Sequence, residues 1–176
     1  MNILSKSSRL SLVLIVLLNS QTLWANLTDE LYVVGEARLK VLLWKIYDSS
    51  LYSRTGQYSG VEPELTLQIN YLRNIRKNQL LGRTEKEWQR LSVNPQNIEQ
   101  WSMELAEILP DVKRGETLTL QVEENLSSSF YYTSEFLGNI NDPDFTEAFL
   151  SIWLSERSSY PELQAQLIGS NSQKQF

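Results

Sequence analysis

The sequence contains neither cysteine nor histidine among its 176 residues. Without cysteine the chain has no disulfide bond and no thiol nucleophile. Without histidine it has no imidazole base and no serine–histidine–aspartate triad, and without both residue types the usual zinc sites are excluded. Any catalysis would have to use tyrosine, lysine, arginine, aspartate or glutamate. We expect no metal ion and no cofactor.

Long hydrophobic runs are also scarce. The apolar run Leu10 to Leu18 follows Lys6 and Arg9, and a small residue, Ala25, comes after it. About nine residues are too few for the ~20 that a membrane-spanning helix needs, but they suit a secretory signal peptide. We therefore predict a signal peptide over residues 1–25, with an uncleaved anchor as the alternative. In a Gram-negative bacterium the product would be periplasmic, with no stable membrane anchor after cleavage.

Basic residues are outnumbered by acidic ones. The chain has 16 lysines and arginines against 21 acids, a net charge of −5, and removal of the two basic residues of the signal peptide changes this to −7. An acidic surface disfavours nucleic acid and anionic membranes as partners. The remaining length is enough for one domain with a real core, and no repeat or linker divides it. We predict a single domain over 26–169 and a disordered tail over 170–176.

The residues that are present show clear strand patterns. In the stretch Gly35 to Tyr52, apolar residues fall on every second position up to Leu43, which is the period of a strand buried on one face. The alternation breaks at 42–44, where we predict a bulge or a tight bend before a second extended piece. We expect residues 26–34 to form a strand ahead of this stretch and residues 65–73 to form one after it.

Helical patterns separate these strands from a second group. We predict a helix from Arg76 to Leu91, in which Thr84 and Glu87 form a capping box. Further helices are expected after Asn94 and Pro95, after Asp142 and Pro143, and from Pro161 to Gly169, and short strands over 118–122, 130–133 and 135–140. This order predicts an α+β fold in which helices cover one face of an antiparallel sheet.

Several segments, taken in order, resemble a known family. GEARLKVLLWKIYDSSLY, INYLRNIRKNQLLGRTEKEW, ILPDVKRGETLTL and FLSIWLSERSSYPELQAQLIG are similar to the secreted bacterial branch of chalcone isomerase-like proteins, from about Val34 to Gly169. The resemblance implies an open-faced β-sandwich, a large antiparallel sheet with helices packed on one face and a ligand cleft between them. It also implies one of two activities. The family's enzymes use an arginine to steady a phenolate, and its non-catalytic members bind fatty acids through an arginine and a tyrosine.

The resemblance places Arg38 at the family's arginine and Tyr47 approximately at a threonine of the enzymes. The helical stretch after YLRNIR has no counterpart of the enzymes' tyrosine and asparagine pair, and the later threonine-bearing site is apolar around Ile152. This favours a non-catalytic binder of a small hydrophobic or acidic ligand such as a fatty acid. The alternatives are an isomerase or intramolecular lyase that uses arginine and tyrosine to stabilise an enolate, and an envelope module that binds another protein.

Five residues are candidates for ligand binding: Arg38, Tyr47, Tyr52, Tyr71 and Arg73. Arg38 either points into solvent or reaches a cleft, where its guanidinium would grip a carboxylate in a bidentate manner. Tyr47 and Tyr52 are either core or rim tyrosines, or they offer a hydroxyl to a ligand. Tyr71 and Arg73 lie where a strand gives way to a helix, which suits either an anion site or a simple salt bridge at the rim.

Overall fold

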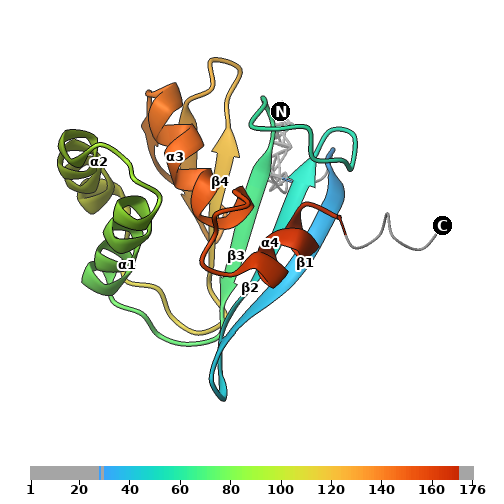
Figure 1. Cartoon of the computed structure of the whole chain (residues 1–176), viewed down its shortest axis with the longest axis horizontal. Coiled ribbons are helices and arrows are strands. Elements are labelled where there is room, and N and C mark those ends of the chain that lie inside the picture. Colours follow the sequence, from blue (N-terminus) through green and yellow to red (C-terminus); the bar gives the residue numbers. More distant parts are fainter. Residues whose placement is uncertain (1–27, 29, 171–176) are drawn as a thin grey trace, which may run out of the picture.

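The computed structural model describes residue 28 and residues 30–170, so the predicted signal peptide and residues 171–176 of the predicted tail lie outside the described residues. Six antiparallel strands form one sheet in the order β1-β2-β3-β4-β5-β6, and four helices cover one of its faces (Figure 1). The strands are β1 Tyr32–Val41, β2 Trp44–Ser53, β3 Thr66–Tyr71, β4 Thr117–Val122, β5 Ser128–Tyr132 and β6 Glu135–Ile140; the helices are α1 Lys77–Arg90, α2 Pro95–Ile108, α3 Pro143–Leu154 and α4 Pro161–Leu167. The predicted α+β architecture is confirmed.

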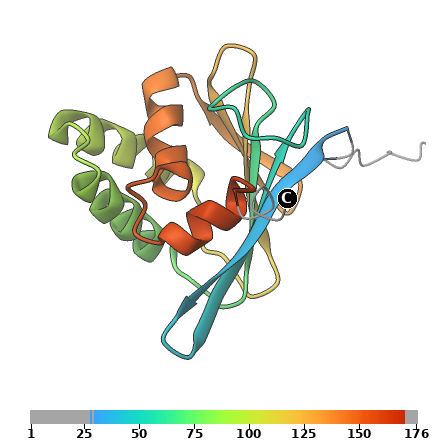
Figure 2. The same ribbon diagram turned by 45° about the vertical axis from the view of Figure 1, so that its right-hand side comes forward.

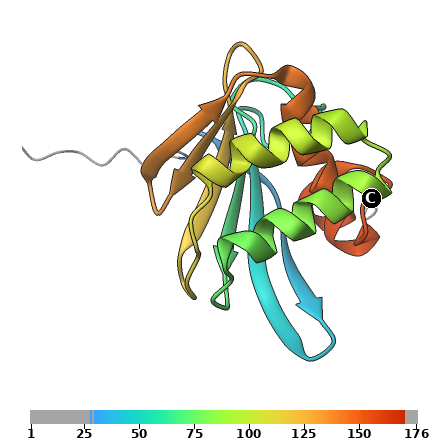
Figure 3. The ribbon, with the colours of Figure 1, turned by 90° about the vertical axis from the view of Figure 1, so that its left-hand side faces the viewer.

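The first two strands form a long hairpin that extends beyond the rest of the sheet (Figure 3). The predicted bend is a two-residue turn at Leu42 and Leu43, and Leu42 has a φ of 55°. This left-handed conformation costs a leucine about 1–2 kcal/mol. The prediction of a separate strand over 26–34 is wrong, because residues 32–34 belong to β1 and the described residues before them lie outside any strand.

The strand register separates an apolar face from a polar one. On the inner face, under the helices, Leu39 lies opposite Tyr47, which in turn lies opposite Tyr71 on β3. On the outer face Arg38 lies opposite Asp48, and Asp48 lies opposite Asn70. Side chains alternate between the faces along each strand, so the buried apolar positions face the helices. Figure 2 shows the helices gathered on one side and the other face left uncovered.

Two helices begin at polar caps that the sequence indicates correctly. The side chain of Asn94 accepts a hydrogen bond from the backbone of Gln96 at the start of α2, and Asp142 caps α3 in the same way. The predicted capping box at Thr84 and Glu87 is wrong, because α1 starts earlier, at Lys77 after the cap residue Arg76, and both residues lie buried inside the helix. Within residues 28 and 30–170, no helix combines the length and apolar content needed to cross a bilayer.

A cluster of aromatic rings fills the core beneath α1, α2 and α3. Trp88, Trp101, Phe130, Phe145 and Phe149 are all nearly inaccessible, and neighbouring rings in the cluster lie 5.5 to 6.3 Å apart between centroids. The indole nitrogens are satisfied: Trp88 donates to a carbonyl of α3 at 3.0 Å, and Trp101 donates to the cap of α3 at 2.9 Å. This cluster packs α3 against the sheet, and two of its rings, Phe130 and Phe149, line the cavity described next.

The last helix lies directly against the first strand. Gly35 of β1 has no Cβ, and an added one would overlap the carbonyl oxygens of Gln166 and Leu167. The close approach of α4 to β1 therefore requires glycine at this position.

Candidate functional site: a cavity between the sheet and the helices

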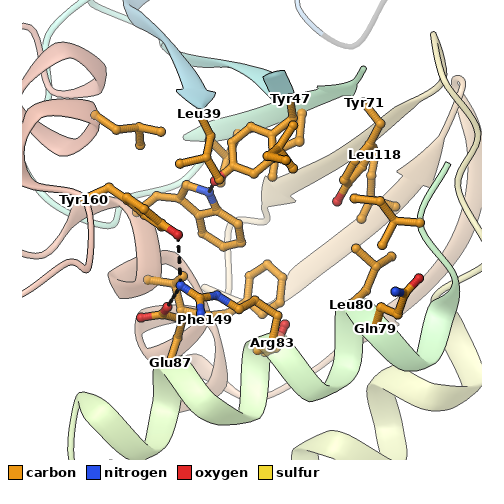
Figure 4. Close-up of a pocket in the computed structure, with 18 of the residues that line it drawn as sticks. Leu39, Tyr47, Tyr71, Gln79, Leu80, Arg83, Glu87, Leu118, Phe149 and Tyr160 are labelled. Carbon is orange, nitrogen blue, oxygen red and sulfur yellow. Dashed lines mark hydrogen bonds and ion pairs between the residues drawn. The ribbon is translucent and has the colours of Figure 1, made fainter. Parts of the chain in front are cut away.

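A cavity of about 410 Å³ lies between the inner face of the sheet and the helices α1, α3 and α4 (Figure 4). Its walls are mostly aliphatic and aromatic, and include Leu39, Ile69, Leu80, Leu118, Phe149 and Ile152. Small-molecule sites in proteins typically have volumes of ~300–1,000 Å³ and mostly apolar walls with a few polar groups. The size and lining therefore suit a small hydrophobic molecule.

Two tyrosines from neighbouring strands supply polar groups inside this cavity. Tyr47 and Tyr71 are cross-strand partners, and their rings meet edge to face with centroids 6.1 Å apart. The Tyr47 oxygen accepts a hydrogen bond from Nε1 of Trp153 at 2.9 Å, which leaves its own proton available for another acceptor. Tyr71 is only 5% exposed, and its hydroxyl makes no hydrogen bond to another described residue.

Burial determines the protonation state of both tyrosines. It raises the pKa of the Tyr47 hydroxyl and the pKa of the Tyr71 hydroxyl well above the ordinary value, because a phenolate would lose its hydration inside the cavity. Both groups remain protonated at neutral pH. They can donate hydrogen bonds to a carboxylate or a carbonyl oxygen.

A charged group on α1 closes one side of the cavity. Arg83 donates to the hydroxyl of Tyr160 at 3.1 Å and pairs with Glu87 at 2.5 Å, as the dashed lines in Figure 4 show. Glu87 is only 4% exposed, and it also accepts hydrogen bonds from Arg90 at 3.0 Å and from Ser159 at 2.7 Å. One carboxylate thus serves two guanidinium groups, so the cluster keeps one net positive charge beside the cavity.

The cavity lining also reaches the hairpin and the loop after β3. Val41 and Trp44 contribute from the two strand ends of the hairpin, and Arg73 contributes from the loop. The guanidinium carbon of Arg73 lies 5.1 Å from the centroid of the Trp44 ring, a cation–π distance. Arg73 forms no ion pair with an acid of residues 30–170. This second cation lies beside the hairpin.

Of the five candidate residues, the structure brings Tyr47, Tyr71 and Arg73 together in the cavity lining, whereas Arg38 and Tyr52 are not part of it. Arg38 lies on the outer face, where both its Nε and its Nη2 bond to the carboxylate of Asp48. Its guanidinium lowers the pKa of that carboxyl group. The physical reason is the strand alternation, which turns Leu39 toward the helices and therefore Arg38 away from them.

The five candidates did not include several polar residues of the cavity wall, among them Arg83, Trp153 and Tyr160. Arg83 and Glu87 are spaced four residues apart on the same side of the helix as Leu80 and Thr84. A charged pair on the apolar side of a predicted helix was the available signal. Within the described part of the chain, no group of three or more acidic side chains is arranged to hold a metal ion.

An open antiparallel sheet, helices on one face and a mostly apolar cavity between them define an α+β fold built around a small-molecule cavity. A family profile described as chalcone isomerase-like matches residues 25–169, and the chain belongs to the chalcone isomerase-like family. It is 27% identical over 136 residues to an uncharacterized protein of Haemophilus influenzae, which covers 77% of this chain and 67% of that protein.

The fold is also similar to a solved structure. The crystal structure of a fatty-acid binding protein of Arabidopsis thaliana matches with a TM-score of 0.64 and 10% sequence identity, and covers 81% of this chain and 88% of that chain. At this identity the comparison shows a shared fold. The resemblance noted from the sequence segments is thereby confirmed for both family and fold.

Proposed function

We propose that this chain is a periplasmic protein that binds a small hydrophobic ligand with an acidic head group, such as a fatty acid, in the cavity. The observation that carries the proposal is the cavity of about 410 Å³, in which protonated tyrosine hydroxyls face otherwise apolar walls. The name of the Arabidopsis protein, fatty-acid binding, supports the same class of ligand. The predicted signal peptide supports the location.

The head group is best accommodated beside Tyr47 and Arg83. Trp153 already donates to the Tyr47 oxygen, so the Tyr47 proton is directed to a different acceptor. Arg83 has more N–H donors than the ones it uses for Glu87 and Tyr160. A carboxylate between these groups would accept a charge-assisted hydrogen bond from each, while the hydrocarbon chain lies against the apolar walls.

The first test compares two arginines on opposite faces of the sheet. Arg83→Met should weaken binding of cis-parinaric acid, a fluorescent fatty acid, by roughly 10- to 150-fold, since a hydrogen bond to a charged group contributes about 1.5–3 kcal/mol. Arg38→Met is the matched control and should leave the affinity unchanged, because its guanidinium binds Asp48 outside the cavity. The opposite pattern, in which Arg38→Met alone loses affinity, would instead assign the contact with the head group to Arg38 on β1.

A second test concerns the natural ligand. Native mass spectrometry of the protein purified from its own periplasm should show a co-purifying lipid carboxylate, and Arg83→Met should reduce its occupancy. Arg73→Met serves as a positional comparison, since Arg73 also lines the cavity and lies beside Trp44 of the hairpin. Loss of the lipid with Arg73→Met but not with Arg83→Met would place the head group at the hairpin end.

The same groups support a second candidate function, an isomerase or intramolecular lyase. A tyrosine that stays protonated beside an arginine can donate a proton to an enolate and stabilise its charge. Under this alternative a chalcone or related enone should cyclise faster with the protein than in buffer, and Tyr47→Phe should remove the acceleration. Equal rates with and without protein from about pH 6 to 9 would exclude that substrate class.

A further inference from the structure

The tip of the β1–β2 hairpin, residues 41–44, carries four large apolar side chains that the core does not use. Val41 is 42% exposed, Leu42 91%, Leu43 96% and Trp44 62%. Two-residue hairpin turns favour glycine or asparagine where φ is positive, yet Leu42 has a φ of 55°. Neither turn geometry nor packing accounts for these leucines, so their apolar surface serves a contact outside this chain.

Positive charge surrounds the apolar tip. Lys40 and Lys45 are cross-strand partners on the two sides of the tip, and Arg73 lies against the Trp44 ring. The loops that follow β3 and precede β4 are at the same end of the sheet, since Ile75 and Val112 form a bridge between them. These loops and the start of α1 also carry Arg76, Lys113 and Arg114, and Lys77, whose ammonium donates to the carbonyl of Ala106.

The acids at this end are fewer and are engaged locally. Asp111 accepts from the backbone of Lys77, and Glu116 accepts from the backbone of Lys113 and from the Tyr132 hydroxyl. Glu135 follows the turn between β5 and β6. The hairpin tip and the loops at this end thus carry seven basic residues and three acidic ones, in a chain whose net charge is −5. The charge of this end is opposite in sign to that of the whole molecule.

We propose that the hairpin tip docks on an anionic lipid bilayer. Leucines and a tryptophan at a projecting tip match the boundary between head groups and acyl chains, and the lysines and arginines around them match anionic head groups. The hairpin projects clear of the helices, so the tip reaches a flat surface before the body does (Figures 2 and 3). Charge complementarity and this shape favour a bilayer over a protein groove.

The cavity lining is continuous with the proposed docking surface. Val41, Trp44 and Arg73 contribute to both. A ligand drawn from a bilayer would meet this end of the cavity first, without crossing bulk water. This route for the ligand rests on the proposed function, whereas the docking itself does not.

Co-flotation with lipid vesicles tests the docking. The protein should float with vesicles of phosphatidylcholine and phosphatidylglycerol, far less with phosphatidylcholine alone, and less at high salt. Lys40→Glu with Lys45→Glu should weaken binding to the anionic vesicles by more than tenfold, since each basic group near such a surface contributes about fivefold. Any contribution of the N-terminal residues is the same in every variant.

The leucines are tested against a matched exposed side chain. Leu42→Ser with Leu43→Ser should reduce vesicle binding by at least about tenfold, whereas Met103→Ser, at a side chain 62% exposed on α2, should leave it unchanged. Neither leucine lines the cavity, so the double variant should bind cis-parinaric acid with full affinity. Failure of vesicle binding and failure of ligand binding are thereby distinguished.

Tryptophan emission supplies an independent readout. Trp44 is exposed, whereas Trp88 and Trp101 are buried and Trp153 is partly buried and bonded to Tyr47. A blue shift on anionic vesicles should therefore come from Trp44 and should vanish in Trp44→Phe. Equal flotation of the wild-type chain and the double leucine variant would overturn the proposal, as would no binding to anionic vesicles. A dimer that the same leucine substitutions dissociate, without vesicle binding, would assign the tip to a second copy of the chain instead.

Discussion

The hydrogen bond between Trp153 and Tyr47 joins α3 to β2 across the cavity, and its removal has two separable effects. Tyr47→Phe deletes the acceptor and leaves the Trp153 N–H without a partner. An unsatisfied, largely buried donor costs about 1–3 kcal/mol, so the free energy of unfolding should fall by that amount. Trp153→Phe removes the donor and some packing, with a cost of about 1–3 kcal/mol that arises from lost volume.

A double-mutant cycle isolates the bond itself. Once both residues are phenylalanine, no unpaired donor remains, so the double variant should be more stable than the sum of the single effects by about 0.5–1.5 kcal/mol. Urea unfolding followed by far-ultraviolet circular dichroism measures all four proteins without relying on tryptophan emission. A coupling energy within about 0.3 kcal/mol of zero would refute the bond as a feature of the protein in solution.

The same variants separate binding from stability. Tyr47→Phe also removes the hydroxyl proton proposed to reach the ligand, so its affinity for cis-parinaric acid should fall by roughly tenfold or more. Trp153→Phe keeps that hydroxyl and should lose much less affinity. If the two variants bind equally well, Tyr47 stabilises α3 and does not hold the ligand.

Three further predictions concern other parts of the chain. Gly35→Ala should lower the free energy of unfolding by about 1–3 kcal/mol, because its Cβ would collide with backbone carbonyls of α4, whereas Gly82→Ala has open space in α1 and should raise that free energy by about 0.5–1 kcal/mol in the same urea titration. The free energy of unfolding should fall above about pH 10, because Tyr47 and Tyr71 keep protons in the folded chain that they lose in the unfolded one, and a steeper fall in wild type than in the variant with both Tyr47→Phe and Tyr71→Phe would confirm this. Intact mass of the exported protein should correspond to a chain that begins at Asn26, and an unprocessed mass would contradict the predicted signal peptide.

The sheet and its helices were largely predictable from local patterns. Strict alternation predicted β3, and Asn94 and Asp142 marked the starts of α2 and α3, because a cap is a contact between residues two or three apart. The prediction of a capping box at Thr84 was wrong because a serine or threonine with a glutamate three residues later also occurs inside helices. There the packing of the whole helix, which extends back to Lys77, outweighs a local signal.

The cavity residues could be predicted from the sequence only where a polar side chain occupies a position on the apolar face of a strand. Tyr47 and Tyr71 occupy positions in register with Leu39 and Ile69, so their strand pattern already turned them toward the helices. Arg38 alternates with those positions, and the same pattern turned it outward to Asp48. The spacing of Arg83 and Glu87 on the apolar side of α1 was a signal that the sequence offered, but the contact of Arg83 with Tyr160 depends on how α1 packs relative to the segment before α4.

The strand order carries a consequence for folding. Every strand pairs with its neighbour in sequence, and four of the five pairings join strands separated by short connections, but β3 and β4 are separated by the whole of α1 and α2. We expect the two three-stranded halves to form early and their union to be the slow step, since it closes the longest loop. Residues of both halves line the cavity, so a newly synthesised chain would complete it only in the final step of folding.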